Sequence, residues 1–266
     1  MAVTIVGVVT DLAAPTLHSI SLEEVRARDA FVRWSIPDDG HAACWAVGSS
    51  VAVVHRRAPR PMLPSPWAVL LGRPAELRPL VDALPGLIGG PPAGVTMSAD
   101  AYELIPHDWA FAARGHWDYM VTSTVPAVPR GVEIEEIDDV DVINAVLDAD
   151  NADAHARPGD PDVQCWLGIG EGSAMACVGA LVLTHNGGGH LRAITTLRQA
   201  RGRGLGSALS AALTRRGLER LSPEVTLGVY SDNVAAIRLY ERLGYRLVHH
   251  FTSAARAEPR DQSDIC

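Results

Sequence analysis

The sequence contains no lysine, so its 23 cationic side chains other than histidine are all arginine. A phosphate-binding loop of the Walker type, G-x-x-x-x-G-K-[ST], needs a lysine beside the phosphates, and this class of nucleotide site is therefore excluded. The 31 acidic residues outnumber the arginines and give a net charge of −8. Proteins that bind nucleic acid nonspecifically usually have a basic domain or face, so we expect no nucleic-acid partner.

Cysteine is scarce, and long apolar runs are missing. None of Cys44, Cys165, Cys177 and Cys266 stands in a C-x-x-C pair, so we expect neither a zinc site nor a disulfide framework. No apolar run approaches the length of about 18 residues that a membrane span needs. The N-terminal "MAVTIVGVVTD" lacks a basic leader and reaches Asp11 early, which is unlike a signal peptide. We expect a cytoplasmic protein without a metal or a membrane partner.

Proline and glycine mark one boundary in the middle of the chain. In "VTSTVPAVPRGVE", Pro126, Pro129 and Gly131 interrupt both helix and sheet hydrogen bonding. We therefore expect one domain over residues 1–125 and a second over 126–256. The last ten residues, 257–266, have little to bury and are expected to form a flexible tail.

The elements of the second half follow from periodicity. Strands are expected at 132–136, 163–169, 174–185, 190–197, 224–230 and 245–253, with helices at 138–150, from 205 onward, and at 233–243. In the first half the pattern predicts strands at 41–47, 50–56, 66–72, 94–98 and 116–122, a helix at 74–84 and a short helix at 99–105. The order of elements repeats, which favours an internal duplication over a coincidence of order. The fold class is α/β.

One segment of the second half is typical of a phosphate site. In "TTLRQARGRGLGSALSAAL" three glycines, Gly202, Gly204 and Gly206, precede an amphipathic helix. Glycine lets the backbone turn tightly, and a helix N-terminus presents unpaired N–H groups and a partial positive charge. This combination binds phosphate groups. The corresponding place in the first half reads "LLGRPAEL", with one glycine and a proline.

A dinucleotide-binding fold is the first alternative for this turn. It requires G-x-G-x-x-G and an acidic residue about 20 residues later, whereas the spacing here is G-x-G-x-G. Asp232 has the position of that acid, but too little chain follows it to complete a doubly wound sheet. This alternative is therefore disfavoured.

A second motif identifies the nucleotide. Arg201-x-x-Gly204-x-Gly206, followed by Asn233-x-x-Ala236-x-x-Leu239-Tyr240-x-x-x-Gly244-Tyr245, closely resembles the GNAT superfamily of acyl-CoA N-acyltransferases. The resemblance covers residues 131–253. It implies two GNAT-like domains in tandem, each with a mixed, mostly antiparallel sheet flanked by helices. It also implies that the central parallel strands splay apart in the second domain, and that the first domain is a degenerate copy without the cofactor loop.

The resemblance also implies the cofactor and the residues that hold it. Coenzyme A, as acetyl-CoA, is expected to place its diphosphate on the glycine turn and its pantetheine between the splayed strands. The residues implied to contact it are Thr196, Leu197, Arg201, Arg203, Gly204, Leu205, Gly206, Ser207, Asn233 and Ala236. Asn233 has a second interpretation as a helix N-cap, which Asn provides well.

The implied reaction is direct attack of a neutral amine on the thioester in a ternary complex. Backbone N–H groups near Thr196 or Leu197 are expected to stabilise the developing oxyanion, and Tyr240 to protonate the leaving thiolate. The family often has a glutamate on the strand before the glycine turn, but "HLRAITTL" has no carboxylate. His190, His155 or a water chain remain as candidates for the general base. Cys165 and Cys177 are interpreted as packing residues.

Eleven carboxylates and one basic residue, Arg157, lie between Glu133 and Asp162. The favoured interpretation is a solvated helix face beside an exposed loop; the alternative is that their local potential attracts a cationic amine. The predicted function is N-acetylation of a primary amine on a small molecule or peptide. The alternatives are a non-catalytic acyl-CoA sensor and an amino-acid N-acyltransferase that uses longer acyl-CoA. Neither the acceptor nor the oligomeric state follows from the sequence, and a homodimer is compatible with it.

Overall fold

A computed structural model of the chain describes residues 16–55, 66–171 and 174–256. The expected absence of a signal peptide, the flexible tail and Cys266 concern segments outside the described residues. The elements of the first half are β1 (His18–Ile20), α1 (Leu22–Arg28), α2 (Ala30–Ser35), β2 (Ala42–Val47), β3 (Ser50–His55), β4 (Trp67–Leu71), α3 (Pro74–Ile88), β5 (Gly94–Ser98), η1 (Ala99–Leu104), η2 (His107–Trp109) and β6 (Phe111–Thr122).

The second half repeats this order of strands and helices. Its elements are β7 (Glu135–Ile137), α4 (Val140–Asp150), β8 (Val163–Glu171), β9 (Ala174–Leu183), β10 (Gly189–Thr196), η3 (Arg198–Ala200), α5 (Leu205–Arg220), β11 (Val225–Tyr230), α6 (Val234–Arg242) and β12 (Arg246–Arg256). All the strands and helices expected from periodicity are present, with shifted ends. β1, α1 and α2 were not expected, because residues 16–40 show no clear period.

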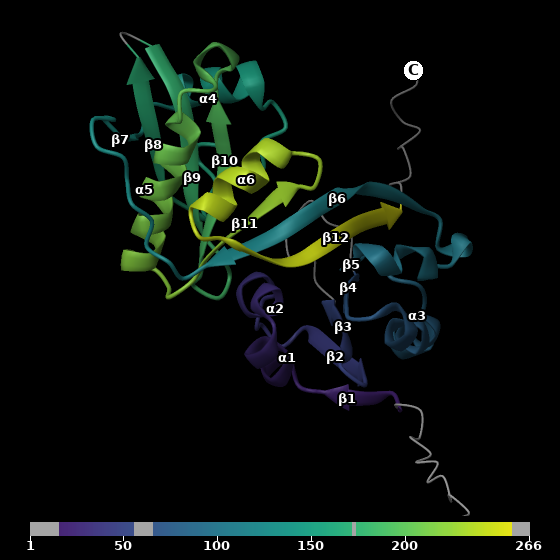
Figure 1. Cartoon of the computed structure of the whole chain (residues 1–266). Helices are drawn as coiled ribbons and strands as arrows, with labels where there is room; N and C mark the ends of the chain where they lie inside the picture. Colours follow the sequence, from purple (N-terminus) through teal and green to yellow (C-terminus); the bar gives the residue numbers. More distant parts are fainter. Residues whose placement is uncertain (1–15, 56–65, 172–173, 257–266) are drawn as a thin grey trace, which may run out of the picture.

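The twelve strands of the described residues form one mixed sheet in the order β1-β2-β3-β4-β5-β12-β6-β11-β10-β9-β8-β7. The sheet is symmetric: strands β7 to β12, counted from one edge, take the same places as strands β1 to β6 counted from the other edge. Each half gives its last strand to the other, since β6 pairs with β11 and β12 pairs with β5. Figure 1 shows β6 and β12 running side by side across the middle of the molecule. The α/β class is confirmed, and the two halves share one sheet instead of having a sheet each.

Helices cover both faces of the sheet, and side-chain alternation shows which face each one covers. On β9, Cys177 and Leu181 pack in the α5 core, while Val178 and Ala180 pack in the α4 core. On β6, Met120 packs in the α5 core, and its neighbour Tyr119 packs against Phe31 of α2. Successive strand residues point to opposite faces. One face is therefore the α5 face, and α4 and α2 cover the other, which we call the α4 face.

The two central parallel strand pairs differ between the halves. β4 and β5 pair from Trp67↔Gly94 to Leu70↔Met97. β10 and β11 pair only from Gly189↔Val225 to Leu191↔Leu227, although β10 continues to Thr196 and β11 to Tyr230. A register shift in β10 and a positive φ of 53° at Ala193 lie where the pairing stops. The expected splaying of these strands is confirmed, and it leaves their carboxyl ends separated.

No helix in the described part of the chain is long and apolar enough to cross a lipid bilayer.

Candidate active site

The glycine turn lies at the open end of the strands that separate. Gly202 and Gly204 have φ values of 78° and 81°, in the left-handed region that favours glycine. Gly204 is the N-cap of α5, and the first helical bond runs from Ala208 N–H to the Gly204 carbonyl over 3.0 Å. The N–H groups of Leu205, Gly206 and Ser207 therefore have no intrahelical acceptor. They form a ready anion site at the helix N-terminus.

Gly206 also permits close approach of this helix to β10. A Cβ atom at Gly206 would lie 3.1 Å from Oγ1 of Thr196. Arg203 is exposed at the turn. Arg201 donates from Nε to the Thr196 carbonyl at 3.0 Å and from Nη2 to Asp150 at 3.2 Å. The Arg201 guanidinium thus connects the turn to the end of β10 and to α4.

Asp150 organises the loop before the turn, although it was not predicted from the sequence. Its side chain is 8% exposed and accepts from the backbone N–H of Arg198 at 2.8 Å, in addition to its ion pair with Arg201. It is the last residue of α4, where a carboxylate is disfavoured by the helix dipole. A carboxylate at the C-terminal end of a helix is therefore a sequence signal that Asp150 has a partner outside α4.

The end of β10 presents a backbone donor toward the gap. Leu197 N–H is already donated to the Ala176 carbonyl of β9 at 2.9 Å. Because hydrogen-bonded and non-hydrogen-bonded positions alternate in an antiparallel ladder, the N–H of Thr196 points away from β9 and toward β11. Of the two expected oxyanion donors, Thr196 is the one whose N–H faces the gap.

Tyr240 of α6 packs in the α5 core, against the ring of Tyr245. It is 8% exposed, and burial raises the pKa of its phenol to about 12. The Cys177 thiol lies close enough to contribute to that rise, and its Sγ is 3.2 Å from Oγ1 of Thr196. Tyr240, Cys177 and the end of β10 thus all lie on the α5 side of the sheet. Burial also raises the pKa of Cys177 to about 11, which agrees with a packing role for this thiol.

Asn233 and Ala236 are at the start of α6. Oδ1 of Asn233 accepts from the N–H of Ala236 at 3.2 Å, so Asn233 is the helix N-cap. Both residues follow directly on the carboxyl end of β11, at the rim of the gap.

His190 is on the α4 face, one position before the strands separate. Its Nδ1 lies 2.8 Å from Oγ1 of Thr226, and Thr226 donates to the Gly189 carbonyl at 3.3 Å. His155 is exposed in the loop after α4, where its carbonyl accepts from Arg192.

Residues of the first half complete this face. Tyr119 of β6 is buried against Phe31, and its hydroxyl lies 3.4 Å from Oγ of Ser35 at the end of α2. Trp34 donates to Glu224 at 2.8 Å, so α2 is anchored on the second half.

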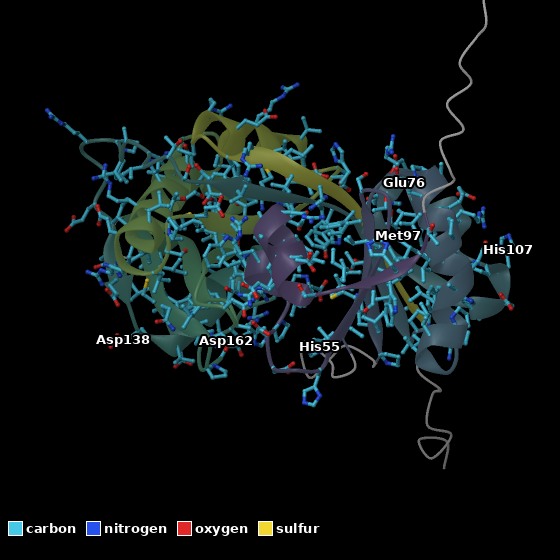
Figure 2. The ribbon with its side chains drawn as sticks, turned by 90° about the horizontal axis from the view of Figure 1, so that it is seen from below. His55, Glu76, Met97, His107, Asp138 and Asp162 are labelled. Atoms are coloured by element: carbon cyan, nitrogen blue, oxygen red, sulfur yellow. The ribbon has the colours of Figure 1, made fainter. Side chains whose placement is uncertain are left out.

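Many of the expected acidic residues already have partners. Asp148 pairs with Arg157, Asp150 with Arg201 and Glu136 with Arg216. Asp138 and Asp162 are exposed, and Figure 2 places them in the second half, away from Glu76 and Met97. Of the described residues, no group of three or more His, Cys, Asp or Glu side chains could hold a metal ion.

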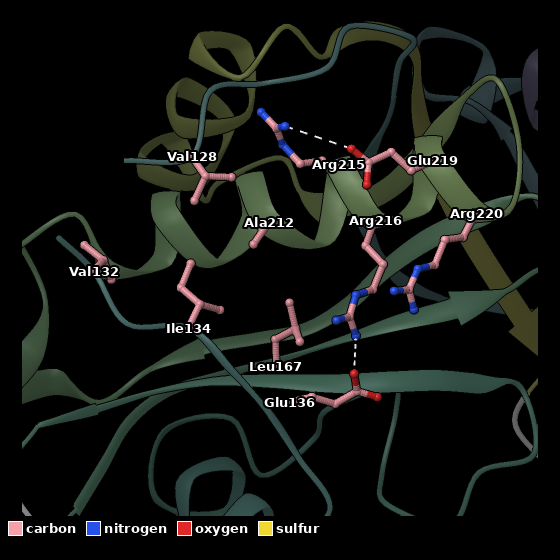
Figure 3. A pocket seen from close by; sticks show the side chains of 10 residues that line it. All are labelled: Val128, Val132, Ile134, Glu136, Leu167, Ala212, Arg215, Arg216, Glu219 and Arg220. Carbon is pink, nitrogen blue, oxygen red and sulfur yellow. Dashed lines mark hydrogen bonds and ion pairs between the residues drawn. The ribbon is translucent and has the colours of Figure 1, made fainter. Parts of the chain in front are cut away.

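A groove of about 410 Å³ lies elsewhere on α5 (Figure 3). Val132, Ile134 and Leu167 form an apolar floor, and Arg216 donates to Glu136 across it at 2.6 Å. The lining residues of α5 begin at Ala212, about 10 Å along the helix from the glycine turn. The groove is therefore separate from the candidate active site.

The equivalent place in the first half is filled by the chain itself. Glu76, in the first turn of α3, accepts from Ser49 N–H at 3.0 Å and from the hydroxyls of Ser49 and Ser50 at 2.9 Å each. These hydrogen bonds, with Ser50 first, lower the pKa of Glu76 to about 2. Pro74, at the start of α3, has no N–H to offer. A carboxylate thus stands where the second half presents open amides.

Comparison with known proteins agrees with this architecture. The GCN5-related N-acetyltransferase from Kribbella flavida is 17% identical, aligns over 80% of this chain and 88% of its own, and has a TM-score of 0.50. The GNAT-family acetyltransferase from Colwellia psychrerythraea is 13% identical over 91% of this chain and 100% of its own, with a TM-score of 0.52. These likenesses concern the fold. No curated protein matches the sequence. The model of the acetyltransferase (GNAT) family matches residues 132–245, and this part of the chain is a GNAT acetyltransferase domain.

Proposed function

We propose that the protein is an N-acetyltransferase that uses acetyl-CoA and a primary amine. Membership of residues 132–245 in the family supports acyltransferase activity in general. The observation that favours a working cofactor site is the open glycine turn at the end of two separated parallel strands. Both features are needed together, because one suits a diphosphate and the other leaves unpaired strand edges for the amides of pantetheine.

The residues of the turn fit the cofactor. The amides of Arg203 to Ser207 would hold the diphosphate, with Arg201 and Arg203 adding charge-assisted contacts at its edge. Leu197, Asn233 and Ala236 would line the passage between the turn and the strands. Bound acetyl-CoA supplies an activated acyl group, and the protein supplies orientation, an oxyanion donor and proton transfer.

Thr196 and Tyr240 would act at the acyl end. The Thr196 N–H, which points toward β11, would donate to the acyl oxygen as negative charge develops there. A phenol of pKa about 12 cannot readily protonate a thiolate whose acid has a pKa of about 8.5, since the difference corresponds to about 5 kcal/mol. We infer that Tyr240 stabilises the leaving sulfur as a hydrogen-bond donor, and that full proton transfer requires the bound cofactor to lower the phenol's pKa.

We assign proton acceptance from the amine to His190 through bridging water, because six strand residues, about 20 Å, separate it from Thr196. An alkylamine with a pKa near 10.4 must lose a proton before it attacks. The hydrogen bond to Thr226 holds the imidazole of His190 on the α4 face of β10. His155, in contrast, is exposed in the loop after α4.

The first half has a supporting role in this proposal. Its β6 borders β11, and its α2 covers the α4 face through Trp34 and Glu224. We therefore propose that residues 1–125 are a degenerate GNAT-like copy, and that residues 126–256 hold the catalytic groups.

Acetyl-CoA turnover with a library of amines, measured as release of free thiol, tests the function. We expect release that depends on the amine. The absence of a carboxylate on β10 favours the alternative of a non-catalytic acyl-CoA sensor. Tight binding of acetyl-CoA in calorimetry without turnover over the whole library would favour the sensor and contradict the enzyme.

A further inference from the structure

Arg192 is on β10 where the strands begin to separate. It lies opposite Ala180, which packs in the α4 core, and it follows His190 by two residues. Residues two apart on a strand share a face, so the side chains of Arg192 and His190 both project on the α4 face. The Arg192 side chain is half-buried, and its Nη1 donates to the His155 carbonyl at 3.1 Å.

The guanidinium of Arg192 lacks an anionic partner in the described part of the chain. Its Nε is buried and has no hydrogen-bond acceptor, and no carboxylate among the described residues lies within ion-pair distance of it. Arg26 and Arg215 also have a buried Nε without an acceptor, but each forms an ion pair, with Asp38 and Glu219 respectively. Buried polar groups are normally satisfied, and buried charges are normally paired. Arg192 is therefore prepared for an anion that the described chain does not supply.

From its position, we infer that Arg192 binds an anionic group of the acceptor substrate and not a phosphate of coenzyme A. The cofactor's phosphates belong at the N-terminus of α5, on the opposite face of the sheet. A ligand that enters there and passes between β10 and β11 directs its acyl end toward the α4 face. The side chains that β10 projects on that face are those of His190, Arg192 and Thr195.

We propose that Arg192 binds a carboxylate of the acceptor, which makes the acceptor an amino acid. The proposal rests on the proposed function and defines its substrate class. The Cβ atoms of His190 and Arg192 are about 7 Å apart, as expected for residues two apart on a strand. This spacing suits a compact ligand whose amine faces His190 and whose carboxylate meets the guanidinium. Guanidinium groups match carboxylates with two parallel hydrogen bonds.

Product binding tests the proposal without relying on turnover. Calorimetry in the presence of coenzyme A would compare N-acetyl amino acids with their carboxamides, over apolar, polar, acidic and basic side chains and including a β-amino acid. For the best-bound pair, we expect the carboxylate form to bind about 10- to 100-fold more tightly, as a charge-assisted hydrogen bond predicts. In Arg192→Gln the two forms should bind equally, with the affinity for the carboxamide changed less than about threefold, whereas Arg192→Lys should retain part of the preference.

Arg215→Gln is the matched control, because this arginine also has a buried Nε but lies on α5. It should leave the carboxylate preference unchanged. The proposal is overturned if no carboxylate binds more tightly than its amide, if Arg192→Gln keeps the preference, or if this variant weakens coenzyme A binding equally. A carboxylate preference without turnover of any amine in the library would refute the proposed enzyme and leave the binding role of Arg192 standing.

Discussion

The two halves of the molecule have the same order of elements but opposite local chemistry at the start of their long helix. In the second half, glycines at 202 and 204 turn the chain so that the first amides of α5 stay open. In the first half, the Glu76 carboxylate is held by Ser49 and Ser50 at the start of α3. The strands beneath α5 separate after Leu191, while those beneath α3 stay paired to Leu70.

The difference shows that a few residues decide whether the turn before the helix is open to a ligand, as before α5, or occupied by a side chain of the protein, as before α3. Both turns offer the positive end of a helix dipole, which favours a negative group. The first half provides that group from its own chain, and the second half leaves the place for a ligand. The shared sheet keeps both halves in one body, because each contributes a strand to the other.

Replacing one tyrosine in each half, Tyr240 and Tyr102, should give the largest contrast. Tyr240→Phe removes the donor to the leaving sulfur, and we expect turnover to fall about 10²-fold or more with little change in the affinity for acetyl-CoA. Steady-state kinetics and calorimetry measure the two effects. Tyr102 lies on η1, the first-half element that corresponds to α6, and Tyr102→Phe should leave turnover unchanged. Equal turnover in Tyr240→Phe and the wild type would remove Tyr240 from the mechanism.

The two left-handed helix-end glycines offer a second contrast. Gly204 has φ 81° and Gly89, at the C-cap of α3, has φ 84°, and neither has an atom within 4 Å of the position that a Cβ would occupy. Both alanine variants should therefore lose a similar 1–2 kcal/mol, roughly, of folding free energy from backbone strain. Only Gly204→Ala should weaken acetyl-CoA binding, by about 10- to 100-fold in calorimetry, because it shifts the open amides. Equal affinity in the two variants would argue against the turn as the cofactor site.

Low pH should remove the stabilisation that Glu76 provides at the start of α3. The pKa of Glu76 is about 2 in the folded protein, below its ordinary value of 4.5, so its carboxylate stabilises the fold above pH 4.5. That contribution is lost as the pH falls toward 2. The melting temperature of Glu76→Gln should be lower than that of the wild type at pH 7, and the difference should shrink at pH 3. Exposed Glu219→Gln is the control, and a pH-independent difference for Glu76→Gln would contradict the role of its charge.

The smallest effect is expected from replacing Asp150, which holds the loop before the glycine turn. Asp150→Asn should weaken acetyl-CoA binding only a few-fold, because it loosens the loop at Arg198 and Arg201 without touching the amides. Asp148→Asn, on the same helix and 65% exposed, is the matched control in the same titration. A loss as large as that of Gly204→Ala would mean that Asp150 shapes the amides directly.

Local pattern was sufficient to predict the glycine turn and the helix that follows it, because glycine spacing and periodicity are properties of short segments. The separated strands followed from the family resemblance. The exchange of β6 and β12 between halves was not predicted, since register across distant strands is not encoded in either segment alone. Glu76 and Asp150 were missed for a related reason. Each looks like an ordinary acidic helix residue until the fold brings Ser49 or Arg201 beside it.

The structure of the acetyl-CoA complex tests the central claim most directly. We predict one cofactor per chain, with its diphosphate within hydrogen-bonding distance of the N–H groups of Gly204, Leu205 and Gly206 and its pantetheine between β10 and β11. A diphosphate bound beside Ser49 at the start of α3, or an unoccupied gap between β10 and β11, would contradict the account.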